Sequence, residues 1–94
     1  MPKVFGLSQN RPNPFSRRTN ILYSIPRKTH VSLRIYNTAG QLVRTLVNSN
    51  EEPGYKTVFW DGLDKNNKRV AQGVYFYRLT AGNYRATKKL LIVR

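Results

Sequence analysis

The sequence feature that most constrains the fold is a series of short segments in which apolar and polar residues alternate. In His30–Asn37, Val31, Leu33 and Ile35 share one face of an extended chain. No stretch has the period of about 3.6 residues that marks an amphipathic helix. About seven short strands at spacings of roughly 8 to 12 residues predict an all-β, immunoglobulin-like antiparallel sandwich. The other expected strands are Ile21–Ile25, Gln41–Val47, Tyr55–Trp60, Val74–Thr80 and Tyr84–Val93.

Two prolines shape the segment Leu7–Asn20. Pro12 and Pro14 fix φ and remove two backbone donors, so this segment is expected to run as an extended edge segment. Phe15 is expected to fill one end of the sandwich. Residues 1–6 lack the apolar core of a signal peptide and are interpreted as leader or cloning-derived residues, which leaves residues 7–94 as one domain.

The stretch Trp60–Leu79 is expected to supply the centre of the core. Trp60 ends one strand, a polar loop follows, and an aromatic strand begins after it. In this second strand the alternation places Tyr75 and Tyr77 inside and Phe76 outside.

The chain offers few groups for catalysis. It has no cysteine, and its single histidine, His30, begins a strand beside a basic turn, where a surface role is expected. Glu51 and Glu52 are adjacent in a loop, so their side chains diverge and do not suit general acid and base work. We therefore expect no enzymatic activity and no cofactor.

The segment Asp61–Asn67 has some of the oxygen-rich spacing of a calcium loop. It lacks the downstream bidentate acid of an EF-hand, and Lys65, Lys68 and Arg69 would repel a cation. Asp and Asn side chains also accept local backbone hydrogen bonds. A turn is therefore expected here, and no metal site.

A net charge of +13 predicts attraction to polyanions that weakens as salt rises. No RNP-like or helix-turn-helix pattern accompanies the basic residues, so a solvated or nonspecifically anion-attracting surface is expected rather than specific nucleic-acid binding. No apolar run approaches the length of about 18 residues that a membrane span needs. The basic residues considered for patches are Arg17, Arg18, Arg27, Lys28, Lys65, Lys68, Arg69, Lys88, Lys89 and Arg94.

Four ordered motifs carry a family resemblance that extends over Leu7–Arg94. They read LSQNRPNPF, VSLRIYNTAGQLVRTL, WDGLDKNNKRVAQGVYFYRL and TKKLLIVR. In this combination the chain resembles the C-terminal sorting domain (type A) of type IX secretion substrates. It also resembles the related immunoglobulin-like domain of the flagellar hook-capping protein.

The resemblance implies a non-catalytic domain at the C-terminus of a large secreted or cell-surface protein. Such a domain is recognised by the outer-membrane translocon, often removed by a sortase, and its cargo is joined to anionic lipopolysaccharide. The implied location is the periplasm in transit, then the outer-membrane surface or the exterior. The implied recognition residues are Lys88, Lys89, Leu90, Leu91, Ile92, Val93 and Arg94. The implied structural motif residues are Asn10, Pro12, Asn13, Pro14, Trp60, Asp61, Gly62, Asp64, Gly73, Tyr75 and Tyr77.

A basic terminal strand with an exposed edge could add to a receptor's sheet, with Lys88, Lys89 and Arg94 providing electrostatic orientation. Asn67 stands where many family members have Gly, and Asn tolerates positive φ. Two alternatives remain open. One is a structural immunoglobulin-like module, in a hook cap or as a spacer, and the other is a basic polyanion-binding module.

Overall fold

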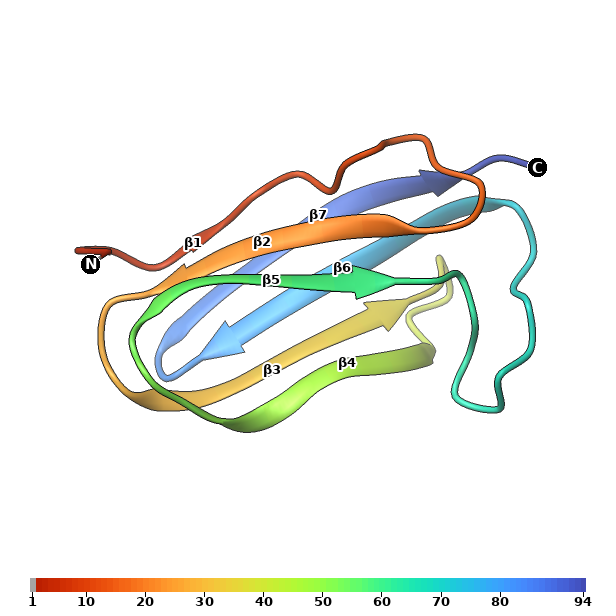
Figure 1. Ribbon diagram of the computed structural model, residues 1–94. Helices are drawn as coiled ribbons and strands as arrows, with labels where there is room; N and C mark the ends of the chain where they lie inside the picture. The colour runs from red at the N-terminus through yellow and green to blue at the C-terminus, as the bar shows by residue number, and fades with distance from the viewer. Residues whose placement is uncertain (1) are drawn as a thin grey trace.

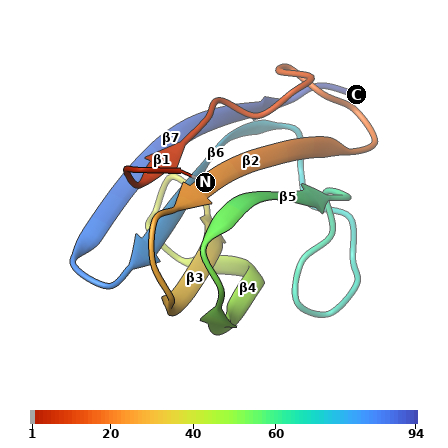
Figure 2. The ribbon, with the colours of Figure 1, turned by 60° about the vertical axis from the view of Figure 1, so that its left-hand side comes forward.

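The computed structural model describes residues 2–94 and places seven strands in two antiparallel sheets that pack face to face (Figure 1). This confirms the predicted all-β, immunoglobulin-like sandwich. Figure 2 shows the two layers from the side. Within residues 2–94, no helix is long and apolar enough to cross a membrane. The strands are β1 (Gly6–Leu7), β2 (Thr19–Ile25), β3 (Thr29–Tyr36), β4 (Leu42–Glu51), β5 (Gly54–Trp60), β6 (Gly73–Ala81) and β7 (Tyr84–Ile92).

The strand order is β1-β2-β5 in the smaller sheet and β4-β3-β6-β7 in the larger one. Alternation sets which side chains each strand buries. In β2, Ile21, Tyr23 and Ile25 are buried between the sheets, whereas Leu22 is exposed. In β6, Tyr75 and Tyr77 point inward, as predicted. The two inner faces together form one continuous core.

Two register shifts interrupt the pairing of β3 with β4. They fall between Leu33 and Arg34 and between Ile35 and Tyr36 of β3, and leave Leu46 and Val43 of β4 as the extra residues. Each extra residue turns the following side chains to the other face. The bulges therefore bring Val43, Leu46 and Val47 against the core, although strict alternation would divide these residues between the two faces. For this reason the sequence alone does not assign the register of β4.

The predicted edge segment crosses between the sheets instead of forming a continuous edge strand. It touches β2 through the Arg11–Asn20 bridge and then reaches β7 through the parallel Phe15–Ile92 bridge. The Phe15 side chain is buried, which confirms that it fills one end of the sandwich. Before this segment, Phe5 stacks on Tyr84 of β7, with ring centroids 5.1 Å apart.

Candidate functional site at the terminal strand

The residues of the terminal motif point in different directions. Leu90 and Ile92 are buried in the core, so neither side chain is available to a partner in the folded domain. Lys88 lies opposite Tyr77 and Lys89 opposite Phe76, which places the two lysines on opposite faces of the larger sheet. Some side chains of the terminal motif therefore lie in the core, and the others lie on the surface.

The outer edge of β7, which the sequence analysis expected to be free for docking, is closed over its C-terminal half. The backbone N–H of Phe15 donates to Leu91 O (3.0 Å), and Val93 N–H donates to Phe15 O (2.9 Å). Asn13 Oδ1 accepts from Leu91 N–H at 3.0 Å. Gln9 Nε2 donates to Lys89 O at 2.7 Å. The expectation of a free edge was wrong here, because the proline segment occupies the hydrogen-bonding groups that a receptor strand would need.

Arg94 is bound to the loop before β6 and does not join the two lysines. Its guanidinium donates to Val70 O at 2.9 Å, and its backbone N–H donates to Gln72 Oε1 at 3.2 Å. Gly62 has a φ of 76°, and a Cβ on it would lie 3.4 Å from Arg94 Nη2. A side chain at this position would therefore be strained and crowded. Lys88, Lys89 and Arg94 therefore form no common patch that could orient a receptor.

Asn10 and Asn13 hold the proline segment in place. Asn10 is buried, and its Nδ2 donates to Thr19 Oγ1 (3.0 Å) and Pro12 O (3.2 Å). Thr19 Oγ1 also donates to Pro12 O at 2.9 Å. These bonds satisfy a buried amide, which would otherwise cost about 1 to 3 kcal/mol. The segment is thereby fixed against β2 before it reaches β7.

A surface formed jointly by the proline motif and the terminal motif lies beside this closed edge. A shallow cavity of about 250 Å³ is lined there by Asn13, Pro14, Val74, Lys89 and Leu91, together with the buried Leu90. We call Asn13, Pro14, Val74, Lys89 and Leu91 the composite surface. It is the place where exposed parts of the two motifs, distant in sequence, meet.

Three aromatic rings connect the third motif to the same end of the sandwich. Trp60 is 1% exposed and packs edge-on against Phe15 (centroids 5.8 Å apart) and Tyr75 (5.7 Å). Its Nε1–H donates to Leu63 O at 2.9 Å, which fastens the following loop. This confirms the predicted core position of Trp60.

The loop after Trp60 is stabilised by local turns, as expected. Asp61 Oδ1 accepts from Leu63 N–H at 3.1 Å, and Asp64 Oδ1 accepts from the N–H groups of Asn66 (2.8 Å) and Lys68 (3.0 Å). These backbone donors lower the pKa of Asp64. Asn67 has a φ of 61°, which confirms the expected left-handed position.

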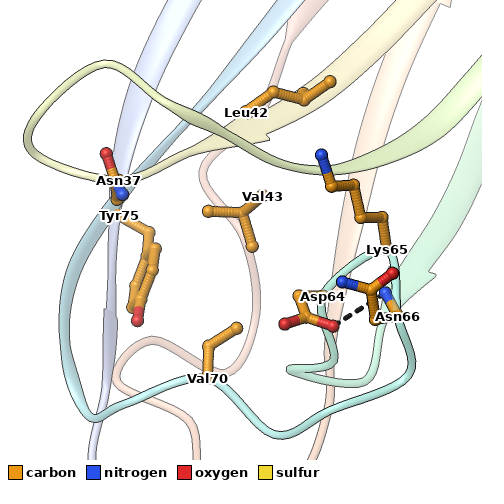
Figure 3. A pocket seen from close by; sticks show the side chains of 8 residues that line it. All are labelled: Asn37, Leu42, Val43, Asp64, Lys65, Asn66, Val70 and Tyr75. Atoms are coloured by element: carbon orange, nitrogen blue, oxygen red, sulfur yellow. Dashed lines mark hydrogen bonds between the residues drawn. The ribbon is translucent and has the colours of Figure 1, made fainter.

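A shallow cavity of about 220 Å³ borders this loop, and Figure 3 shows Val43, Val70 and Tyr75 around it. Asp64 is the one carboxylate in its lining, and it already accepts the bond from Asn66 drawn there. Residues 2–94 contain no group of three or more His, Cys, Asp or Glu side chains that could hold a metal ion.

His30 is exposed on β3, as expected. Its two ring nitrogens lie 3.2 Å from Asn50 Oδ1 and 2.8 Å from Asn48 Oδ1, both on the neighbouring strand β4. Neither carboxylates nor nucleophiles are among these partners, so the geometry assembles no catalytic pair around His30.

The two antiparallel sheets, packed face to face, define the protein as an immunoglobulin-like β-sandwich domain. The chain belongs to the FlgD Ig-like domain family, whose model matches residues 17–85, well over half of the chain. No curated protein matches the sequence.

Two solved structures from Porphyromonas gingivalis share the fold. Part of dimeric latent PorU is similar with a TM-score of 0.74 and 18% sequence identity, over 99% of this chain and 10% of that chain. Part of PorZ, described as an essential bacterial surface component of the type IX secretion system, is similar with a TM-score of 0.62 and 20% identity, over 96% of this chain and 11% of that chain. The chain thus spans about a tenth of each of these proteins.

Proposed function

We propose that the chain is a non-catalytic sorting domain that directs a larger protein, attached on its N-terminal side, through the outer-membrane translocon of type IX secretion. It acts in the periplasm in transit and then at the outer-membrane surface or outside the cell. A sortase that removes the domain, and anionic lipopolysaccharide that receives the cargo, complete the proposal. The similarity to PorZ, a surface component of that system by its description, supports it.

One observation carries this proposal: three of the four motifs of the sorting-domain resemblance converge on one end of the sandwich. The proline motif is bonded to the terminal motif through Phe15 and Leu91. Phe15 in turn packs on Trp60 of the third motif. Segments far apart in sequence thus build one local structure. A receptor that recognises the folded domain requires a structure of this kind.

We assign recognition to the composite surface. Its exposed groups come from the proline segment and from alternate residues of β7, whereas Leu90 and Ile92 maintain the fold. A translocon component that contacts Pro14, Lys89 and Leu91 together would bind only a folded domain that carries both motifs, because only the folded domain brings these residues side by side.

The test is export of a periplasmic reporter that carries the full chain at its C-terminus, in a bacterium with type IX secretion. Deletion of Lys88–Arg94 would remove Leu90 and Ile92 from the core, so a double substitution, Lys89→Gln with Leu91→Gln, is the sharper variant. We expect the wild-type fusion on the cell surface or in the medium, and severalfold less of the variant there. Circular dichroism checks that the variant folds.

The matched control is Leu22→Gln, since Leu22 is also a partly exposed leucine, 45% exposed, but lies on the other sheet. Its export should equal that of the wild type. Retention of the folded wild-type fusion in the periplasm would refute the sorting role. Equal export in a strain without the translocon would refute it as well.

A structural immunoglobulin-like module is the second candidate, and the FlgD Ig-like family match favours it. Such a module would act as a spacer or scaffold between other domains. It would leave the reporter in the periplasm while folding normally, so the export experiment separates the two functions.

A further inference from the structure

The outward-facing side chains of the larger sheet lie in rows across the strands. Tyr36 of β3 lies opposite Phe76 of β6, which lies opposite Lys89 of β7. In the next row Arg34 faces Arg78, which faces Thr87. Arg85 follows one row further along β7. We call these residues the outer face: Arg34, Tyr36, Phe76, Arg78, Arg85, Thr87 and Lys89.

The outer face has no carboxylate to balance its cations. The chain has four acidic residues, and each lies elsewhere and has its own partner. Glu51 accepts from Tyr23 at the inner side, Glu52 pairs with Lys28, Asp61 pairs with Arg44, and Asp64 binds the amides of its own loop. The outer face is therefore uniformly positive.

Arg34 and Arg78 face one another directly on adjacent central strands. Like charges in this arrangement destabilise a sheet, and no acid lies between them to offset the cost. Arg34 Nη1 donates to Ser32 Oγ at 3.5 Å, and Arg78 Nε donates to Thr87 Oγ1 at 3.3 Å. Since a guanidinium has five N–H donors, these bonds leave donors on both arginines for an anion.

Aromatic rings adjoin these cations. The Arg78 guanidinium lies 5.4 Å from the centre of the Tyr36 ring. A shallow cavity of about 320 Å³ lies there, walled by Tyr36, Phe76 and Arg78, with Asn37, Thr38 and Thr87 supplying polar groups. The surface thus combines ring faces, guanidinium planes and hydrogen-bonding groups within one hollow.

We propose that the outer face binds single-stranded nucleic acid without sequence specificity. Arginines with N–H donors left for phosphate lie here beside aromatic rings on an open sheet face. Proteins bind single strands with this combination, because bases stack on the rings and guanidinium planes. The sequence did not predict this binding, because it shows no nucleic-acid motif and most of its tyrosines fall on strands where a core role competes. The alternation in β3 does place Tyr36 on the face opposite Val31, Leu33 and Ile35, and only the strand pairing brings it beside Phe76.

The first test measures binding of a fluorescent oligo(dT) of about 15 nucleotides across a salt series. With about four phosphate contacts, log K should fall with log salt at a slope of about −3. Arg34→Gln with Arg78→Gln should make the slope about 1.4 units shallower. We expect this variant to keep its fold, because it removes a like-charge pair.

The matched control is Lys65→Gln with Arg69→Gln, which lowers the net charge equally in an exposed loop on another part of the surface. It should bind almost as the wild type does. Equal weakening in both variants would show that binding follows net charge alone and would overturn the proposal.

The second test distinguishes nucleic acid from an acidic glycan. Phe76→Leu keeps an apolar cover but removes the ring, so the oligonucleotide should bind about tenfold more weakly at an unchanged salt slope. Heparin, which has no bases to stack, should bind Phe76→Leu and wild type alike. If Phe76→Leu weakens oligonucleotide binding no more than it weakens heparin binding, the outer face is only a polyanion surface and the proposal is wrong.

Discussion

At the scale of single residues, Tyr77 shows how the core accommodates a polar atom. Its side chain is buried, and its hydroxyl donates to Ser8 O at 2.6 Å, which ties β6 to the start of the proline segment. Burial raises the pKa of Tyr77 from 10.0 to about 12. Tyr23 links the two sheets in a similar way by donating to Glu51 Oε1 at 2.6 Å, and its pKa is also raised, chiefly by burial.

Tyr77 makes a prediction for alkaline pH. Because its folded pKa of about 12 exceeds the unfolded value of 10.0, the stabilisation is complete below pH 10.0 and is lost as the pH rises toward 12. The loss from this group should reach about 2 to 3 kcal/mol. Tyr77→Phe should lower the free energy of unfolding by about 1 kcal/mol at neutral pH and flatten the decline in that alkaline window. Urea titrations at several pH values measure both effects, and a decline as steep as in the wild type would contradict this account.

At the scale of elements, the decisive contact is between the proline segment and β7. Asn10 and Asn13 fix the segment by side-chain bonds, Phe15 anchors it in the core, and the backbone of Phe15 closes the β7 edge. Unpaired strand edges invite pairing with other chains. The segment therefore protects the terminal strand and at the same time builds the composite surface.

Phe15→Ala should release this segment from β7. The substitution empties a buried site and should cost about 3 to 5 kcal/mol. Hydrogen exchange at the amides of Leu91 and Val93 should accelerate more than exchange in β3, since their acceptors belong to the segment. Arg17→Ala, in an exposed position of the same connection, is the control and should leave exchange unchanged. If Leu91 and Val93 remain as protected as in the wild type, the segment does not depend on its phenylalanine anchor.

At the scale of the whole molecule, charge is the dominant property. The net charge is +13, and the ion pairs within residues 2–94 are Lys28–Glu52 at 3.7 Å and Arg44–Asp61 at 3.8 Å. Exposed pairs of this kind contribute about 0 to 1 kcal/mol each. Repulsion among the remaining cations therefore opposes folding, and stability rests on the aromatic and aliphatic core.

Added salt should consequently stabilise the domain. Between about 0.02 and 0.3 M NaCl the Debye length shortens severalfold, so the melting temperature should rise by several degrees. The Lys65→Gln, Arg69→Gln variant should respond less, because it carries less charge. Scanning calorimetry at each salt concentration measures this, and a melting temperature that stays constant or falls would show that self-repulsion is unimportant.

The sequence by itself determined the local properties of the chain. Alternation predicted the strands, the inward direction of Tyr75 and Tyr77, and the core position of Trp60, because the direction of a side chain in a strand depends on its immediate neighbours. The Asp and Asn residues predicted the turn at Asp64, because such side chains bond to the backbone of their near neighbours. The Gly that many family members have at the position of Asn67 indicated its positive φ, which Asn tolerates. The family motifs were also visible, but not where they meet.

Only the tertiary structure decided which segments far apart in the sequence are neighbours. Asn13 and Leu91 are 78 residues apart in sequence, yet their bond closes the β7 edge that local reasoning expected to be free. The register of β3 against β6 likewise places Tyr36 beside Phe76 and Arg34 beside Arg78. Such pairings are set by packing of the whole core, which no local pattern encodes. Both candidate surfaces of this protein therefore arise from long-range pairing of residues whose individual orientations follow from the sequence.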